Sequence, residues 1–451
     1  MAKKIRTPVV NKRTVAILLM TEEDKPSLNF EITESIRIAR TNLLQRNFKK
    51  ILFNYTLNIT NKIKMNYAML KKNIACKYSL TFFSAACLLI FSSCDNSARK
   101  TDSNSLDGSK TVVIDSTNTT VDLTPADPKP DWGKDMTDPM AVVIEKLVSF
   151  EAPPLTSLSA QEARKQPTPA DAAMAVIEEH NISVPVSNLD TVGRDIAVPG
   201  GEIHLRIYTP KTGKDSYPVL VYYHGGGWVI AGLDTYNASA EALANRVEAI
   251  VVSVAYRQAP EYKFPTAHND SYAAYEWVVK NADSIKGDSN KIAVVGESAG
   301  GNLAAAVGIM ARDEGMQLPL YQVLIYPIAG YDFNTMSYKE SESTKPLSSG
   351  LMKWFFDKYL KSAADAKSPL ISLVNANLNG LPATTIIGAE YDPLRSEGAL
   401  LAENLKQAGV PVNYKLYNGT THEFFGMAAV LDQAKDAQAL VATDLKSAFN
   451  K

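Results

Sequence analysis

The segment 296–300 reads Gly-Glu-Ser-Ala-Gly and contains the residue best suited to nucleophilic chemistry, Ser298. The apolar run 292–295 precedes it, and an alanine-rich helical pattern over residues 301–311 follows it. A serine in a Gly-x-Ser-x-Gly turn between a strand and a helix sits on a sharp, strained backbone that exposes its hydroxyl. The flanking glycines leave room for close packing around the turn. We therefore predict that Ser298 is the nucleophile of an acyl transfer.

Three consecutive glycines, Gly225, Gly226 and Gly227, lie in a His-Gly-Gly-Gly-Trp sequence directly after the apolar run 219–223. Backbone N–H groups without neighbouring Cβ atoms can approach a substrate oxygen closely. Such donors stabilise the negative charge that develops in the transition state of acyl transfer. We predict that Gly226 and Gly227 supply two of them, with Gly225 remaining possible, and that the N–H of Ala299 supplies another.

A serine nucleophile needs a base and an acid that orients the base. In the fold that carries this type of turn, the acid and then the histidine follow the nucleophile along the chain. His422 is the only histidine after Ser298 and is the predicted base. The predicted acid is Asp392, which follows a buried strand pattern at 384–389. Glu390 is the alternative, because it lies on the same side of an extended segment.

These motifs together resemble the bacterial hormone-sensitive-lipase-like esterases over residues 138–449. The resemblance implies an α/β-hydrolase fold, in which an eight-stranded, mostly parallel sheet is flanked by helices and carries an N-terminal helical cap. It implies hydrolysis of short to medium carboxylic esters of small molecules through an acyl-enzyme, without a metal or other cofactor. Three positions depart from the usual family residues Asp, Leu and Gly. They are Glu297, Gln258 and Glu423. The motifs that carry the resemblance are 224–228, 256–261, 296–301 and 392–395.

Two alternatives to ester hydrolysis remain open from the sequence. The same three catalytic groups can serve a carbohydrate deacetylase or a peptidase, because a fold does not fix the substrate. A non-catalytic surface lipoprotein that uses the fold as a binding module is the alternative of a different class. Oligomeric state is not indicated by the sequence.

The elements around the motifs alternate between strand and helix, which favours a parallel sheet covered on both faces. Strands are predicted near 203–208, 219–223, 249–254, 291–295, 321–326, 384–389 and 412–417. Helices are predicted over 236–246, 268–281, 350–360, 394–407 and 428–449. Residues 138–451 form one predicted domain, whose cap spans about 138–185 and contains helices over 140–150 and 159–180. We expect Trp228 and Trp354 to line a mostly apolar substrate pocket.

A secretory signal is predicted at residues 65–94. Lys71, Lys72 and Lys77 precede the uncharged, mostly apolar run 78–93, which ends at Cys94. A basic start, a short apolar run and small residues at the end are typical of a signal peptide. The Ser-Ser-Cys ending resembles a bacterial lipobox, which implies lipidation of Cys94, export and attachment to a membrane at the periplasmic or cell-surface side. An uncleaved anchor is the alternative.

The remaining front of the chain differs in composition from the predicted domain. Residues 1–64 carry 13 Lys and Arg against 5 Asp and Glu, whereas the whole chain has 47 against 48. We expect Met65 or Met69 to be the true start, since a signal belongs at an N-terminus, with a disordered basic arm as the alternative. Residues 95–137, rich in Ser, Thr, Asp and Asn, are expected to form a flexible tether. No nucleic-acid-binding motif is present in the sequence.

Overall fold

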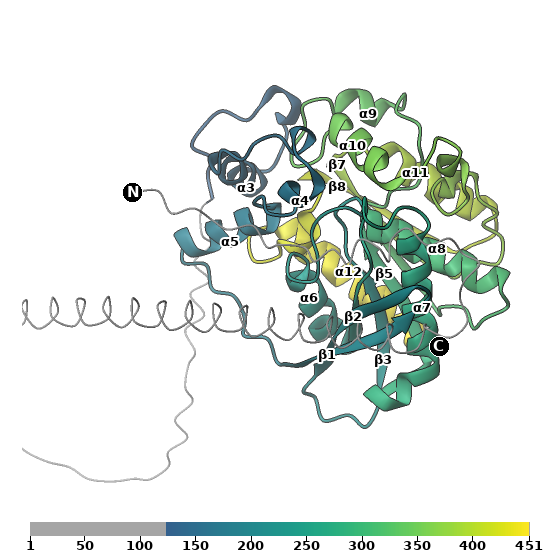
Figure 1. The fold of residues 1–451 in the computed structure, drawn as a ribbon. Helices are drawn as coiled ribbons and strands as arrows, with labels where there is room; N and C mark the ends of the chain where they lie inside the picture. Colours follow the sequence, from purple (N-terminus) through teal and green to yellow (C-terminus); the bar gives the residue numbers. More distant parts are fainter. Residues whose placement is uncertain (1–122, 451) are drawn as a thin grey trace, which may run out of the picture. The chain divides into compact units, whose positions relative to one another are not determined.

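The computed structural model describes residues 123–450, and its core is one eight-stranded sheet in the order β1-β2-β4-β3-β5-β6-β7-β8 (Figure 1). β2 pairs antiparallel with β1 and β4, and all other neighbours are parallel. This arrangement confirms the predicted α/β-hydrolase fold. The strands are β1 Leu189–Val198, β2 Gly201–Pro210, β3 Tyr217–Tyr223, β4 Ile250–Ala255, β5 Gly287–Glu297, β6 Gln322–Ile325, β7 Thr384–Tyr391 and β8 Val412–Thr421.

Alternate residues of the central strands face opposite sides of the sheet, so apolar side chains lie on both faces. Helices cover both of these faces. On β3, Val219 and Val221 belong to the hydrophobic cluster that contains residues of α7, α8, α10 and α11, whereas Leu220 and Tyr222 belong to the cluster that contains residues of α3, α5, α6 and α12. The α-helices are α3 Asp138–Ser149, α4 Ala160–Ala163, α5 Pro169–Glu179, α6 Asn237–Val247, α7 Thr266–Asn281, α8 Ala299–Asp313, α9 Met336–Glu340, α10 Ser349–Tyr359, α11 Arg395–Gln407 and α12 Asp432–Phe449. The 3₁₀ turns are η2 Asp131–Gly133, η3 Leu155–Ser157, η4 Ala282–Ile285, η5 Asp365–Lys367, η6 Leu373–Asn375 and η7 Phe424–Gly426.

The parallel strands bring the predicted site residues to one edge of the sheet. His224, Ser298, Asp392 and His422 each follow directly after the last residue of a strand, namely β3, β5, β7 and β8. The carboxyl ends of parallel strands lie at the same edge, where open α/β sheets bind their ligands. Helices α3, α4 and α5 lie at the same end of the domain as α9 and α10, in the upper part of Figure 1.

Strand β1 was not predicted from the residue pattern, which indicated seven strands. Most of its residues are exposed, and it contains the charged residues Asp190, Arg194 and Asp195. Among residues 123–450, it forms the outer edge of the sheet and pairs with β2 alone. An edge strand with two solvated faces has little of the hydrophobic alternation by which strands are recognised.

The predicted helix over 159–180 is wrong in its continuity, because the structure has two shorter helices there. α4 ends at Ala163 and α5 begins at Pro169. Each helix has its own N-terminal capping box, made by Ser159 with Glu162 and by Thr168 with Asp171. Pro167 lies between them and Pro169 is the first residue of α5. Proline inside a helix removes a hydrogen bond and clashes with the preceding turn, so one continuous helix is disfavoured here.

The last part of the predicted tether, residues 123–137, packs on the domain instead of extending from it. Leu123 and Met136 are buried. The N–H of Thr137 donates to the carbonyl of Gly419 at 3.1 Å. The two apolar side chains and the backbone hydrogen bond attach the segment to the domain. The predicted leader 1–64, the signal with Cys94 and the tether up to residue 122 lie outside the described residues.

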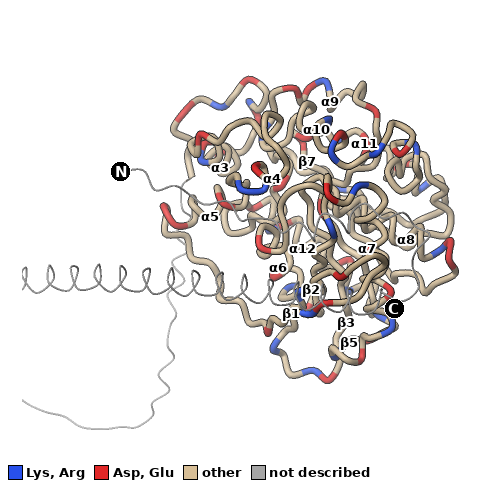
Figure 2. Tube along the Cα trace, viewed as in Figure 1, with Lys and Arg blue, Asp and Glu red and all other residues tan. Residues whose placement is uncertain are grey.

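Acidic and basic side chains are interspersed along the described chain (Figure 2). Several form ion pairs, such as Lys146 with Glu179 and the buried pair of Arg257 with Asp270. Within residues 123–450, no helix combines the length and the hydropathy that a membrane crossing requires.

Candidate active site

Ser298 lies in the strained turn that the sequence predicts. Its backbone angles are φ 57° and ψ −119°, a region that residues with a side chain rarely occupy. The N–H of Ser298 donates to the carbonyl of Ile325 at 2.9 Å, which fixes the turn to β6. A Cβ on Gly300 would lie 1.9 Å from the carbonyl oxygen of Tyr223, so only glycine fits this position. The close approach of the chain to Tyr223 therefore explains why glycine follows Ser298 two positions later.

Three predicted groups form one hydrogen-bond chain. The Oγ of Ser298 lies 2.9 Å from Nε2 of His422. Nδ1 of the same ring lies 2.7 Å from Oδ2 of Asp392. All three side chains are buried. Because an ionised carboxylate only accepts, Nδ1–H donates to Asp392, which leaves Nε2 free to accept from the serine hydroxyl.

The two candidate acids have different partners. Asp392 receives a second hydrogen bond from the N–H of Leu394 at 2.9 Å, which holds its carboxylate toward His422. Glu390 accepts from the N–H of Gly419 at 2.7 Å. Of the two carboxylates, only Asp392 is hydrogen-bonded to the imidazole. Glu390 instead ties β7 to the end of β8.

The charge of Asp392 changes the basicity of the imidazole. Burial alone would lower the pKa of His422, but the Asp392 carboxylate and its hydrogen bond raise the pKa above the usual 6.5. Glu423 and Glu297 act in the same direction from farther away. The imidazolium that forms when His422 accepts a proton is therefore stabilised within the site.

Gly226 and Gly227 line the cavity beside Ser298 and have positive φ angles of 95° and 59°. Within residues 123–450, their N–H groups and that of Ala299 donate to no protein acceptor. Gly225 does not line the cavity. A Cβ on it would lie 2.2 Å from the Tyr236 hydroxyl, so this glycine serves close packing. The two glycines favoured from the sequence thus line the cavity with N–H groups that are unpaired within residues 123–450, as donors to an oxyanion would require.

The segment 256–261 packs against the glycine loop, which comprises residues 224–231. The Tyr256 ring stacks on His224 at 4.3 Å between centroids, and its hydroxyl donates to the His224 carbonyl at 2.8 Å. Nε2 of Gln258 donates to the carbonyls of Ile230 and Ala231. Gln258 is one of the departures from the usual family residue, and its amide here fixes the end of the loop.

Glu297, another departure, is buried directly before the nucleophile. Its carboxylate accepts from the hydroxyls of Tyr222 at 2.6 Å and Tyr326 at 2.5 Å. Burial, and then the charge of Glu423, raise the pKa of Glu297 to about 7, although the two tyrosine hydrogen bonds partly offset this. Glu297 therefore links β3, β5 and the end of β6 beneath Ser298.

Glu423 follows His422 in the left-handed backbone region, at φ 72°, where glycine is usually favoured. Its Oε1 accepts from the buried Tyr236 hydroxyl at 2.5 Å and lies 3.8 Å from Nε2 of His422. Burial raises the pKa of Glu423. The charge of His422 and the hydrogen bond from Tyr236 act in the opposite direction and partly offset this rise. Tyr236 was not among the predicted site residues, because no motif marks it.

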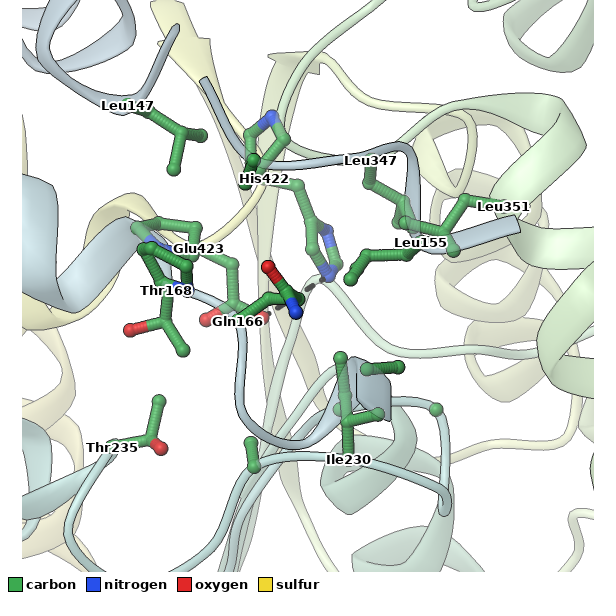
Figure 3. A pocket seen from close by; sticks show the side chains of 18 of the residues that line it. Leu147, Leu155, Gln166, Thr168, Ile230, Thr235, Leu347, Leu351, His422 and Glu423 are labelled. Atoms are coloured by element: carbon green, nitrogen blue, oxygen red, sulfur yellow. Dashed lines mark ion pairs between the residues drawn. The ribbon is translucent and has the colours of Figure 1, made fainter. Parts of the chain in front are cut away.

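A cavity of about 710 Å³ lies over the triad and is lined by Ser298 and His422. The segment 147–169, which contains the end of α3, all of η3 and α4, and the start of α5, supplies much of its lining. Figure 3 shows Leu155 and Gln166 of this segment near the His422 ring. Arg164 joins α4 to the glycine loop, because it donates to the Val229 carbonyl at 2.7 Å and pairs with Glu261. The cap segment is therefore a wall of the site.

Trp228 and Trp354 do not line this cavity, which differs from the prediction. Trp228 is fully buried and stacks on Tyr359 at 4.5 Å between centroids. Phe355, the neighbour of Trp354 on α10, lines the cavity in its place. Successive residues of a helix point about 100° apart, so the sequence does not distinguish which of two adjacent aromatic residues faces the site.

No cluster of three or more His, Cys, Asp or Glu side chains with the geometry of a metal site occurs among the residues that the structure describes. The site contains a serine hydroxyl, an imidazole, a carboxylate and N–H groups that have no acceptor in the described part of the chain. This arrangement is chemically suited to activate a hydroxyl and to stabilise an oxyanion.

The chain matches known proteins over this domain. The sequence model of an α/β-hydrolase-fold family matches residues 220–426. Carboxylesterase NlhH of Mycobacterium tuberculosis is 39% identical over 253 residues, which are 55% of this chain and 79% of that protein. Ethyl acetate hydrolase of Pseudomonas putida is 32% identical over 298 residues, or 65% and 92% of the two chains. A hyperthermophilic esterase from the archaeon Pyrobaculum calidifontis has a similar structure, with a TM-score of 0.61, 37% identity and coverage of 68% and 96%.

Proposed function

The chain belongs to the hormone-sensitive-lipase-like group of α/β-hydrolases, and from this membership we propose that it is a serine carboxylesterase acting on small-molecule esters. The relatives named above are esterases and ester hydrolases. The observation that carries the proposal is the chain of hydrogen bonds from Ser298 through His422 to Asp392 at the base of the cavity.

The proposed reaction has two halves. Ser298 Oγ attacks the ester carbonyl while Nε2 of His422 takes its proton, and the oxyanion accepts hydrogen bonds from the N–H groups of Gly226, Gly227 and Ala299. The intermediate collapses when His422 returns the proton to the leaving alkoxide, which frees the alcohol and leaves an acyl-enzyme. A water molecule, deprotonated by His422, then releases the acid in the same way.

The pH dependence of the proposed reaction follows from His422. The base must be unprotonated, and the Asp392 carboxylate keeps the pKa of His422 above 6.5. A raised pKa keeps the ring protonated, and therefore inactive as a base, up to a higher pH. On acidification, the loss of activity therefore begins above pH 6.5. We expect kcat/KM, measured between about pH 5 and 9, to show an acid limb with an apparent pKa above the usual histidine value. An acid limb centred below that value would contradict the proposed environment of the base.

The substrate class is tested by direct comparison of leaving groups and acyl chains. We expect hydrolysis of p-nitrophenyl esters with short to medium acyl chains, with rates that fall toward palmitate as the cavity is filled. Acetylated sugars and peptides are the comparison substrates for the deacetylase and peptidase alternatives. Turnover of peptide amides in preference to all esters would reject the carboxylesterase proposal.

We further propose that the enzyme is exported and held at a membrane by a lipid on Cys94. Lys71, Lys72 and Lys77, the apolar run 78–93 and the Ser-Ser-Cys ending support this reading of the sequence. An acyl chain contributes about 0.8 kcal/mol of membrane affinity for each buried CH₂, so several chains on one cysteine give stable attachment.

The variant Cys94→Ser tests the anchor in cells that process bacterial lipoproteins. We expect wild-type protein to incorporate radiolabelled palmitate and to sediment with membranes. The variant should incorporate no label, because serine cannot form the thioether that carries the lipid. Cys87→Ser is the matched control and should be labelled like the wild type. Equal labelling of the Cys94→Ser protein would reject lipidation at this position.

A further inference from the structure

The two sides of the cavity differ in chemistry. Leu155, Leu347 and Leu351 lie on one side in Figure 3, and Glu423, Thr168 and Thr235 lie on the other. All six line the same cavity as Ser298 and His422. The apolar side suits an acyl chain, whereas the other side offers hydrogen-bonding groups.

The position of Glu423 assigns the polar side to the alcohol part of an ester. In a serine hydrolase the leaving oxygen takes its proton from the base, so the alcohol must lie next to Nε2 of His422. Oε1 of Glu423 lies 3.8 Å from that nitrogen, as the dashed line in Figure 3 marks. A group on the alcohol close to the ester oxygen therefore lies within reach of this carboxylate.

The Glu423 carboxylate is held in place by one hydrogen bond, and only one of its two oxygens has a donor in the described part of the chain. Tyr236 donates to Oε1, and no group within residues 123–450 donates a hydrogen bond to Oε2. The side chain is 19% exposed, so an alcohol that covers it removes it from water. A buried acceptor without a donor costs free energy, which favours an alcohol that brings a donor of its own. The Thr235 hydroxyl likewise has no partner within these residues and lines the same side.

The other charges of the cavity favour a neutral donor over a cationic one. Arg164, Arg206 and Lys345 line the cavity against Asp234 and Glu423. Arg164 and Arg206 are paired with Glu261 and Asp234. Lys345 has no ion-pair partner within residues 123–450, and an ammonium group on the alcohol would meet its charge in the cavity. A hydroxyl group carries a donor without that repulsion.

On the basis of the proposed esterase function, we propose that the site prefers esters of polyhydroxy alcohols, such as glycerol monoesters, and that Glu423 accepts a hydrogen bond from a hydroxyl next to the ester. Glu423 is then a specificity-determining residue at a position where the family usually has glycine. The hydroxyl donates to Oε2, while the acyl chain lies along Leu155, Leu347 and Leu351.

The test compares glycerol 1-monobutyrate with propyl butyrate, which has the same carbon skeleton without the free hydroxyls. For the wild type we expect a kcat/KM ratio of about 10 or more in favour of the glycerol ester. Glu423→Gly should bring this ratio close to one, and φ 72° at this position accommodates glycine without strain. Glu423→Gln keeps a neutral acceptor oxygen and should give an intermediate ratio. Glu342→Gln, at an exposed position outside the cavity, should leave the ratio unchanged.

The ratio of the two kcat/KM values distinguishes a contact with the substrate from an effect on His422. A change in the base lowers kcat/KM for both esters by the same factor and leaves the ratio unchanged. A wild-type ratio near one, or a Glu423→Gly variant that loses both activities equally, would overturn the inference. If the wild type hydrolyses neither ester nor p-nitrophenyl butyrate, the esterase function fails instead, which is a distinct result.

Discussion

Replacing Ser298 by alanine should lower kcat on p-nitrophenyl butyrate by about 10⁴ to 10⁶-fold. The hydroxyl that lies 2.9 Å from Nε2 of His422 is lost, and with it the acyl-enzyme route. Residual turnover comes from the cavity and the N–H donors, which the substitution leaves in place. Thermal unfolding should remain cooperative. A variant that keeps the wild-type rate would reject Ser298 as the nucleophile.

The second large effect is expected from Asp392→Asn, which should lower kcat by about 10⁴-fold. An asparagine amide that donates to Nδ1 places the ring proton on Nε2, so the base loses the lone pair that accepts from Ser298. The same variant should move the acid limb of the pH profile downward, because Asp392 raises the pKa of His422.

Glu390→Gln is the matched control for this variant. Its carboxylate contacts the backbone at Gly419 and makes no hydrogen bond to His422. We expect a loss of less than about tenfold, as for a substitution that perturbs a structural contact near the site. If Glu390→Gln were the inactive variant and Asp392→Asn the active one, the acid assigned in the triad would be wrong.

Ser298 was predictable from its local sequence, and His422 from its order along the chain. Ser298 lies in a glycine-flanked turn after a buried strand, and His422 is the only histidine after it. The choice between Asp392 and Glu390 needed the structure, since both follow one strand and face the same way in an extended segment. The hydrogen bond to His422 distinguishes them.

What the sequence missed depends on contacts between distant segments. Trp228 follows three glycines, and its φ of 59° accompanies burial of the indole against Tyr359, away from the cavity. Tyr236 reaches Glu423 across 187 positions in the chain. No local pattern records such an approach. Glu423 departs from the usual family residue in the sequence, whereas the 3.8 Å distance between its Oε1 and Nε2 of His422 depends on the folded chain.

The most direct test of the central claim is the mass of the protein after reaction with a fluorophosphonate ester. Such reagents phosphonylate a serine, with fluoride as the leaving group, only where a neighbouring base and oxyanion donors activate it. We predict one adduct per chain, located on Ser298 by peptide mapping, that forms in parallel with the loss of esterase activity. Loss of activity with the adduct on another residue, or full reaction of the Ser298→Ala variant, would contradict the account.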